Sequence, residues 1–298
     1  IAATRVKNTS DFALAGRSLP LPMVITATFA TWFGSETILG LPGRFIESGI
    51  AGVIEEPFGS GMALILVGTF FAHKLYKQNI LTLGDYYRDR YGRSVELLCS
   101  VAIVISYLGW VGAQVTALGL VINLITEGAV SMTTGMVIGA AVVLAYTMVG
   151  GMWSVAMTDF VQMIVIVVGL VAILWFATDL AGGMDKVVDY ARGRDLFHAF
   201  PEPTTTGWLF WISAAMTMMI GSIPQQDVFQ RVMSAKNLPT AVAGPILGGS
   251  FYILFAFVPM FIVVAAILVM PDAAEKMLSE DPQQLLPTLV RDYMPMWL

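Results

Sequence analysis

Long apolar runs separated by short polar segments dominate this chain. Two of the longest flank a lone carboxylate: residues 128–158 carry no Asp, Glu, Lys or Arg, Asp159 follows, and residues 160–178 are again uncharged. A helix needs about 20 consecutive apolar residues to cross the hydrocarbon core of a bilayer. The pattern therefore predicts membrane-spanning helices on both sides of Asp159.

Seven membrane spans are predicted when the same pattern is followed along the whole chain. They are rich in Leu, Ile, Val, Ala and Phe and contain Gly and Pro, which membrane helices tolerate. We place them at residues 20–41, 55–74, 95–124, 132–149, 155–178, 207–233 and 240–270. The expected fold class is an all-α membrane protein, a helical bundle that forms one transmembrane domain over residues 1–298.

The composition agrees with this class, since 57% of the 298 residues are apolar and only 12% are charged. A soluble domain carries about 25% charged residues. The net charge of −5 gives no sign of nucleic-acid binding, and a lone cysteine, Cys99, excludes a disulfide framework or a cysteine metal cluster. No motif indicates an organic cofactor. The chain lacks an initial Met and ends where a further apolar segment starts, so we expect a fragment that is incomplete at both ends.

The distribution of Lys and Arg gives the expected orientation in the membrane. If residues 1–19 are cytoplasmic, that side of the predicted topology holds ten Lys and Arg residues and the other side holds six. Cytoplasmic loops carry the excess of positive charge, although the rule is weak for long loops such as residues 179–206. We therefore expect a multi-pass protein of the plasma (inner) membrane, with residues 1–19 in the cytoplasm.

Two predicted spans contain residues that interrupt helices. The first span includes residues 32–36 (WFGSE), and the sixth includes residues 221–227 (GSIPQQD). Proline removes a backbone donor, and glycine permits non-helical dihedral angles. Broken helices five spans apart fit the first helices of two repeats of five, an arrangement found in secondary transporters. A pair of ordinary kinks explains the pattern equally well.

Several polar and aromatic residues within the spans are candidates for function. An ionisable side chain just inside a span, such as Asp159, usually marks an ion or substrate path; alternatively, Thr158 and Asp159 begin a helix and Asp159 caps it. Trp110 and Gln114 are one helical turn apart and can face one cavity. Packing in the bundle core is the alternative explanation for Trp110 and for Trp32, which lies at the first interruption.

Four segments together resemble the sodium/solute symporter family. They are residues 11–19 (DFALAGRSL), residues 40–43 (GLPG), residues 83–87 (LGDYY) followed by 90–92 (RYG), and residues 150–162 (GGMWSVAMTDFVQ). The resemblance implies a five-plus-five inverted repeat, of which residues 20–298 would form the first seven core helices. The fragment would then end before the eighth core helix.

The resemblance also implies a sodium site and a co-transported Na⁺. Its ligands would be the backbone carbonyls of Ala30 and Phe33 at the break of the first core helix, together with hydroxyls on the eighth. Free carbonyls at the end of a half-helix carry partial negative charge and suit a hard cation. Asp159 matches the family's aspartate beside the sodium site and its cytoplasmic exit.

The choline-type branch of that family is the most similar by eye. It binds a quaternary ammonium in an aromatic cage, and Trp32 and Trp110 match two positions of the cage. Two other aromatic positions of the cage are Ser60 and Gln225 here, which leaves choline itself in doubt. Compensating charge would come from Glu36, Glu56 or Asp227. Alternatively, Ser60, Gln114 and Gln225 would hydrogen-bond a polar amino acid, a carboxylate or a sugar.

The sequence therefore predicts a sodium-coupled secondary active symporter that imports a small organic solute by alternating access, and not an enzyme. A heptahelical receptor is one alternative, but its Asp-Arg-Tyr motif would follow the third span, whereas residues 89–91 follow the second. An intramembrane enzyme is another, and it needs a Ser–His pair or two facing aspartates at depth. Neither His73 nor His198 falls well inside a predicted span.

Overall fold

A computed structural model describes residues 2–295, and most of them are helical. Short 3₁₀ or π-helical turns, labelled η, interrupt or join the α-helices. In chain order the elements are η1 (Ala3–Arg5), α1 (Thr9–Leu14), η2 (Ala15–Arg17), α2 (Leu21–Trp32), η3 (Glu36–Gly40), α3 (Leu41–Ser48), η4 (Ile50–Val53), η5 (Ile54–Gly59), α4 (Ser60–Leu66), η6 (Val67–Phe71), α5 (Ala72–Gln78), α6 (Leu83–Tyr91), α7 (Arg93–Ile125), α8 (Met132–Leu180), α9 (Met184–Gly193), α10 (Thr205–Gly221), α11 (Gln226–Ser234), α12 (Leu238–Phe255), α13 (Phe257–Val269), α14 (Pro271–Glu280), η7 (Pro282–Gln284) and α15 (Leu285–Tyr293).

The chain forms two compact units, each assembled from three separate segments. The first unit contains Ile1–Thr31, Met62–Gln162 and Gly221–Ser250, and the second contains Trp32–Gly61, Met163–Ile220 and Phe251–Leu298. Two of the unit boundaries, after Thr31 and after Ile220, fall beside the two interruptions that the sequence predicts.

The predicted spans correspond to apolar helical stretches of the described chain. Four stretches are long and apolar enough to cross a membrane: Ile50–Gln78, Arg93–Ile125, Met132–Leu180 and Leu238–Val269. The pair α10 and α11 makes a fifth if it counts as one bent span, and α2 is a shorter apolar helix. The all-α membrane fold is confirmed, with the predicted spans 132–149 and 155–178 joined in α8.

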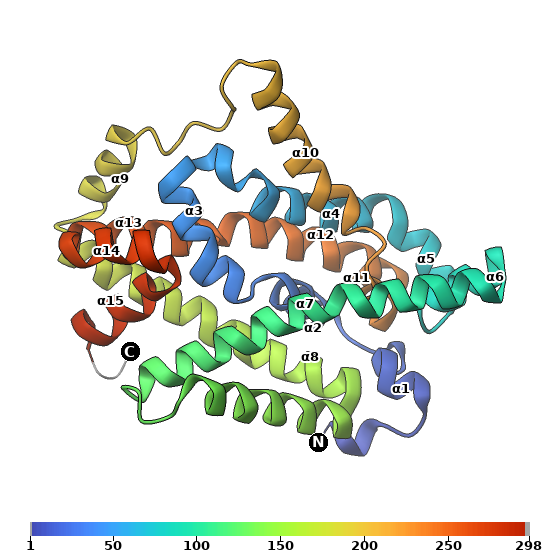
Figure 1. The fold of residues 1–298 in the computed structure, drawn as a ribbon. Helices are drawn as coiled ribbons and strands as arrows, with labels where there is room; N and C mark the ends of the chain where they lie inside the picture. Colours follow the sequence, from blue (N-terminus) through green and yellow to red (C-terminus); the bar gives the residue numbers. More distant parts are fainter. Residues whose placement is uncertain (1, 296–298) are drawn as a thin grey trace. The chain divides into compact units, whose positions relative to one another are not determined.

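Gly151 divides α8 into these two predicted spans. A straight helix of 49 residues would be about 74 Å long, more than twice the roughly 30 Å of a bilayer core. Gly151 has the non-helical angles φ 50° and ψ −142°, and the ribbon of α8 reverses direction within its length (Figure 1). A Cβ at this position would lie 2.4 Å from the backbone carbonyl oxygen of Phe12. Positive φ and the close approach both require glycine.

In the first unit, α7 packs against the beginning of α8. The two helices run side by side after the turn that joins them (Figure 1), and a Cβ on Gly135 would lie 3.2 Å from the Cα of Gly119. At the other end of α7, an apolar cluster joins α1, α6 and α11. Its buried members are Leu14, Leu83, Phe229 and Met233.

The same end of the first unit ties the start of one interrupted span to the end of the other. The Leu19 N–H donates to the Ser234 carbonyl at 3.0 Å, and the Lys236 N–H donates to the Leu19 carbonyl at 2.9 Å. The Tyr76 hydroxyl donates to the Ala235 carbonyl at 2.8 Å. The residues before α2 and after α11 are therefore held together by main-chain bonds.

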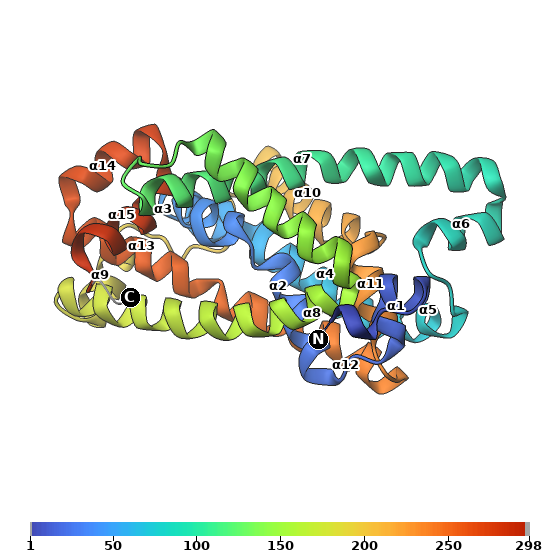
Figure 2. The ribbon, with the colours of Figure 1, turned by 90° about the horizontal axis from the view of Figure 1, so that it is seen from below.

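In the second unit, α13 is the most deeply buried helix. Its buried residues include Met260, Ile262, Val263 and Val264. The elements that pack on it include α3, α9, α14 and α15, and Figure 2 shows α9, α14 and α15 around it. This unit therefore has a core of its own around α13.

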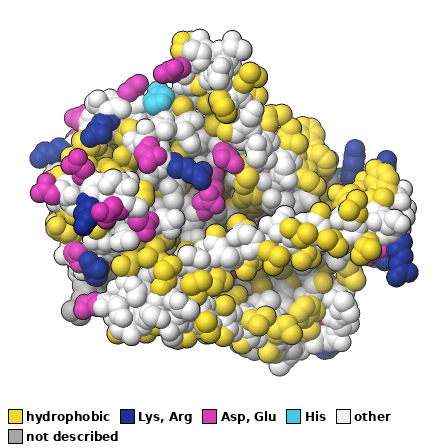
Figure 3. Space-filling model, viewed as in Figure 1, with side chains coloured by type: hydrophobic (Ala, Val, Ile, Leu, Met, Phe, Trp, Pro, Cys, Tyr) yellow, Lys and Arg dark blue, Asp and Glu magenta, His cyan; other side chains and the backbone are white. Residues whose placement is uncertain are grey.

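The surface of the long helices agrees with a membrane environment. On the face drawn in Figure 3, α7 presents mainly hydrophobic side chains beyond its charged first turn. Its large apolar side chains that are more than 60% exposed are Leu97, Leu98, Val104, Ile105, Leu108 and Ile125. Charged side chains on that face gather over α9 and α14 of the second unit. Apolar surface of this kind along a helix suits contact with lipid or with other apolar helices.

Candidate functional site

The first predicted interruption is present at the end of α2. The helix ends at Trp32, and helical structure resumes around Ser35 and Glu36. In a continuous helix the Gly34 N–H would bond to the Ala30 carbonyl. Here it donates instead to the Trp32 carbonyl at 3.0 Å. The break therefore redirects a donor away from Ala30, the first of the two carbonyls that the family resemblance assigns to sodium.

The two predicted sodium ligands occupy different surroundings. Ala30 lies in the last turn of α2, in the first unit. Phe33 lies at the break itself, in the second unit, and its side chain is 2% exposed. The Phe33 ring meets the Tyr252 ring edge-on, with the centroids 6.2 Å apart. Phe33 is thus anchored by its side chain, so the backbone beside Gly34 is held in place.

The second predicted interruption lies between α10 and α11. α10 ends at Gly221 and α11 begins at Gln226, and the break between them contains Ser222 and Pro224. Gln225 precedes the first residue of α11 and has extended dihedral angles, and its side chain makes no capping bond there. The Ser222 hydroxyl oxygen is buried without a hydrogen-bond partner in the described chain. This break thus leaves the Ser222 hydroxyl without a protein partner in the described chain, while the Gln225 N–H donates to the Ser222 carbonyl at 3.3 Å.

Asp159 lies inside α8, so the structure excludes the alternative in which it caps a helix. Its Oδ2 is buried and has no hydrogen-bond partner among residues 2–295. The charged group that acts on it is Arg231 of α11. The Nε of Arg231 is also buried without a partner within that range, and its Nη1 donates to the Asp227 carbonyl at 3.4 Å. An intramembrane carboxylate with an open oxygen suits a cation path.

Two predicted solute residues, Trp32 and Ser60, lie in the second unit. Trp32 ends α2 and is half-buried, and Ser60 begins α4 and is completely buried. The Ser60 hydroxyl has no hydrogen-bond partner in the described part of the chain. An unpaired buried hydroxyl costs about 1–3 kcal/mol. Ser60 is therefore suited to bind a water, an ion or a solute.

The other predicted solute residues, Trp110, Gln114 and Gln225, lie in the first unit. Trp110 and Gln114 are one turn apart on α7. The Trp110 side chain is 46% exposed, so it does not pack in a closed core of the described chain. Its ring meets the Tyr107 ring edge-on, with the centroids 6.4 Å apart. Tyr107 therefore orients one of the two predicted cage residues.

Sequence reasoning missed the hydrogen bonds between Tyr107 and α11. The Tyr107 hydroxyl donates to the Asp227 Oδ1 at 2.6 Å and accepts from the Asp227 N–H at 3.1 Å. Next to it, the Leu83 N–H donates to the Gln226 Oε1 at 2.9 Å. These bonds fix the start of α11, directly after the second break. No sequence spacing indicates them, because Tyr107 and Asp227 are 120 positions apart.

A second network missed by sequence reasoning surrounds Glu56. Its Oε1 accepts hydrogen bonds from the hydroxyls of Thr37, at 2.8 Å, and of Tyr252. These hydroxyls are 3.2 Å from each other. Glu56 is 8% exposed. Glu56 and Asp227 are thus each hydrogen-bonded to a tyrosine. Both belong to the carboxylates that the sequence offers as compensating charge for a solute.

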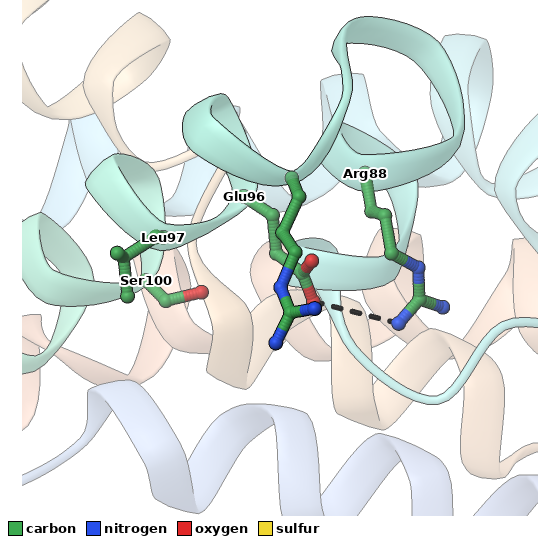
Figure 4. Close-up of a pocket in the computed structure, with 5 residues that line it drawn as sticks. Arg88, Glu96, Leu97 and Ser100 are labelled. Carbon is green, nitrogen blue, oxygen red and sulfur yellow. Dashed lines mark hydrogen bonds and ion pairs between the residues drawn. The ribbon is translucent and has the colours of Figure 1, made fainter.

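A pocket of about 530 Å³ lies where α6 meets α7 (Figure 4). Arg88 of α6 faces Glu96 of α7 across it, at 3.5 Å. Its remaining lining residues are Arg93, Leu97 and Ser100. None of the sequence-predicted site residues belongs to this lining, so the charged pocket is separate from the candidate transport residues.

Comparison with known proteins identifies the family. A family model described as the sodium:solute symporter family matches residues 12–298. The chain belongs to this family. Its relatives are transporters and not enzymes, so the intramembrane enzyme and the receptor are set aside. Family membership and the apolar helices identify a multi-pass membrane protein.

Curated relatives match over part of their length. A high-affinity choline transporter 1 from Caenorhabditis elegans is 29% identical over 258 residues, which is 85% of this chain and 43% of the relative. A sodium/glucose cotransporter 4 from Danio rerio is 28% identical over 276 residues, which is 85% of this chain and 41% of the relative. The chain therefore spans less than half the length of these relatives.

A solved structure has the same fold. It is described as the substrate-bound outward-open state of a Na⁺-coupled sialic acid symporter, and it is 18% identical to this chain. The TM-score is 0.82, and the match covers 99% of this chain and 62% of the other. The predicted all-α membrane transporter fold is confirmed at this level.

Proposed function

We propose that the protein is a sodium-coupled secondary active symporter that imports a small organic solute by alternating access. Family membership supports the class of activity. The single observation that carries the mechanism is the pair of interrupted helices, α2–η3 and α10–α11. Unwound segments at membrane depth expose main-chain groups that would otherwise be bonded within the helix, and transporters use such segments to bind ions and solutes.

The sodium ion would bind at the first break. The carbonyls of Ala30 and Phe33 are the proposed ligands, together with hydroxyls that the family places on an eighth core helix. The redirected N–H of Gly34 supports this assignment, since that donor bonds to Trp32 and not to Ala30. Asp159, with its open Oδ2, would lie on the sodium path. No organic cofactor is part of this proposal.

The solute would be bound by Trp32, Ser60, Trp110, Gln114 and Gln225. The orphaned hydroxyl of Ser60 supports a polar contact, and the exposed indole of Trp110 supports an aromatic one. A quaternary amine, an amino acid, a carboxylate and a sugar all fit an indole combined with hydroxyl and amide groups. One relative is named for choline, a quaternary amine, and another is named for glucose, a sugar, so both classes belong in the test.

The proposal also covers the membrane location and the orientation of the chain. Residues 1–298 would belong to one transmembrane domain in the lipid bilayer of the plasma (inner) membrane, with residues 1–19 cytoplasmic. Main-chain bonds tie Leu19 to Ser234 and Lys236, so the cytoplasmic ends of the two broken spans would move together. If sodium and solute both bind preferentially to one conformation, the coupling free energy between their binding sites would be roughly 1–3 kcal/mol.

The test is uptake by the full-length protein in proteoliposomes, with a panel of quaternary amines, amino acids, carboxylates and sugars. We expect at least one compound to accumulate only when a sodium gradient is imposed inwards. Potassium replaces sodium in the matched control and should abolish accumulation. Accumulation that is the same in sodium and potassium would overturn the proposal.

A further inference from the structure

Glu56 lies in a closed cluster of hydroxyl groups within the second unit. It comes from η5, Thr37 comes from η3 and Tyr252 comes from α12. The Thr37 hydroxyl is 2.8 Å from the Glu56 Oε1 and 3.2 Å from both the Tyr252 hydroxyl and the Trp32 carbonyl. The Tyr252 hydroxyl also donates to the Glu56 Oε1. Tertiary structure therefore brings four oxygen atoms into hydrogen-bond contact at the end of α2.

The number of hydrogen atoms available to this cluster depends on Glu56. Each of the hydroxyls of Thr37 and Tyr252 carries one hydrogen, and an ionised carboxylate carries none. The four oxygen–oxygen contacts would then share only two hydrogens. A proton on Glu56 adds a third: Glu56 donates to Thr37, Thr37 donates to the Trp32 carbonyl, and Tyr252 continues to donate to Glu56. The arrangement is thus better satisfied with one added proton.

The charges around Glu56 lead to the same conclusion. The groups that act on its carboxyl are the hydroxyls of Tyr252 and Thr37, the carboxylate Glu36 of η3 and the cation Arg44 of α3. The Arg44 Nη2 is 3.5 Å from the Glu36 Oε1, so this cation faces another carboxylate. No Lys, Arg or His forms an ion pair with Glu56 in residues 2–295. A buried carboxylate without a cation partner is costly as an anion.

A metal ion is a poorer occupant than a proton. Glu56 is the one carboxylate among the four oxygen donors, and the described residues hold no group of three or more His, Cys, Asp or Glu side chains that could bind a metal ion. We therefore consider a proton as the ligand of this cluster.

We propose that Glu56, Thr37 and Tyr252 form a buried proton-binding site, with Glu56 as the group that holds the proton. Release of the proton turns the Thr37 hydroxyl toward the ionised Glu56. The Trp32 carbonyl, at the break of the first span, then loses its side-chain donor. Protonation of Glu56 is in this way linked to the hydrogen bonds of the break. The proposal stands independently of sodium coupling.

The test is infrared difference spectroscopy of the purified full-length protein between neutral and strongly alkaline pH. We expect a carboxylic-acid C=O band at neutral pH that is lost at alkaline pH and is missing from Glu56→Gln. The matched control is Glu47→Gln, because Glu47 is an exposed carboxylate on α3 of the same unit. This control should keep the band unchanged.

A second variant covers the case in which Glu56→Gln does not fold. Tyr252→Phe keeps the carboxyl group but removes one of its hydrogen bonds, so the band should shift to higher frequency without being lost. The proposal is overturned if wild-type protein lacks the band, or if the band is the same in the wild type, Glu56→Gln and Tyr252→Phe. Sodium-driven uptake is measured separately and does not enter this outcome.

Discussion

The two interruptions differ in how their polar groups are satisfied. At the first, the Trp32 carbonyl accepts from both the Gly34 N–H and the Thr37 hydroxyl. At the second, the Ser222 hydroxyl has no partner in the described chain and Gln225 makes no side-chain cap. The first break is therefore closed by main-chain and side-chain hydrogen bonds of its own residues. The second has a main-chain bond from the Gln225 N–H to the Ser222 carbonyl, at 3.3 Å, but its Ser222 hydroxyl is unpaired in the described chain.

This difference suggests different tasks for the two breaks. A closed break holds its backbone in one arrangement, which suits a small cation that needs oxygens at set positions. A break with an unpaired buried hydroxyl suits a larger ligand or water that supplies the missing hydrogen bond. In the proposed transporter, the first break would serve sodium and the second would serve the solute. Four substitutions can break or sharpen this comparison.

Tyr107→Phe should have the largest effect, because it removes the support at the edge of the second break. The variant loses both hydrogen bonds with Asp227 and keeps the ring. Hydrogen bonds to charged groups contribute about 1.5–3 kcal/mol, and we expect a loss of this size in the free energy of unfolding in mixed micelles. Tyr146→Phe on α8 is the control and should stay within about 0.5 kcal/mol. Equal stability of the two variants would show that the second break needs no support from α7.

Thr37→Val tests the closed nature of the first break. It removes the hydroxyl that contacts Trp32, Glu56 and Tyr252 and leaves buried acceptors with fewer donors. The expected loss is about 1–3 kcal/mol in the same unfolding measurement. Thr116→Val, in which an exposed hydroxyl bonds only to its own helix, should cost much less. A cost for Thr37→Val no greater than for this control would contradict the description of the first break.

Asp159→Asn tests the ion path and not the stability of either break. Loss of the negative charge should weaken the apparent sodium affinity of uptake about tenfold, which corresponds to about 1.4 kcal/mol. Asp179→Asn removes an exposed carboxylate from the same helix and should leave the sodium affinity unchanged. If both variants keep the wild-type sodium affinity, Asp159 has no role in the path.

Ser222→Ala should have the smallest effect on stability, because its hydroxyl has no partner to lose. We expect the free energy of unfolding to change by less than about 0.5 kcal/mol. Solute affinity should fall roughly threefold to tenfold, the value of one hydrogen bond of about 0.5–1.5 kcal/mol. A large loss of stability with unchanged solute affinity would show that the second break is closed like the first.

Local sequence signals predicted the fold and the two breaks well. Apolar runs predict the positions of α7, α8 and α12–α13 along the chain, because a helix that crosses lipid must be a long apolar segment. Residues such as Gly34 and Pro224 mark the breaks through their own backbone chemistry. The predicted spans 132–149 and 155–178 are the two parts of α8, which meet at the non-helical residue Gly151.

The polar networks could not be predicted in the same way. Glu56 meets Tyr252 across 196 positions, and Tyr107 meets Asp227 across 120. Such pairs arise from tertiary packing and leave no periodic pattern in the sequence. The roles assigned to Ala30, Phe33 and the solute residues came from family resemblance, and they stay predictions.

The most direct test of the central claim is reciprocal binding of sodium and solute to the full-length protein at equilibrium. Binding of radioactive sodium is measured with and without a transported solute, and solute binding is measured with and without sodium. We predict that each ligand raises the affinity of the other by the same factor, about 5- to 150-fold. Binding of either ligand that ignores the other would contradict the account.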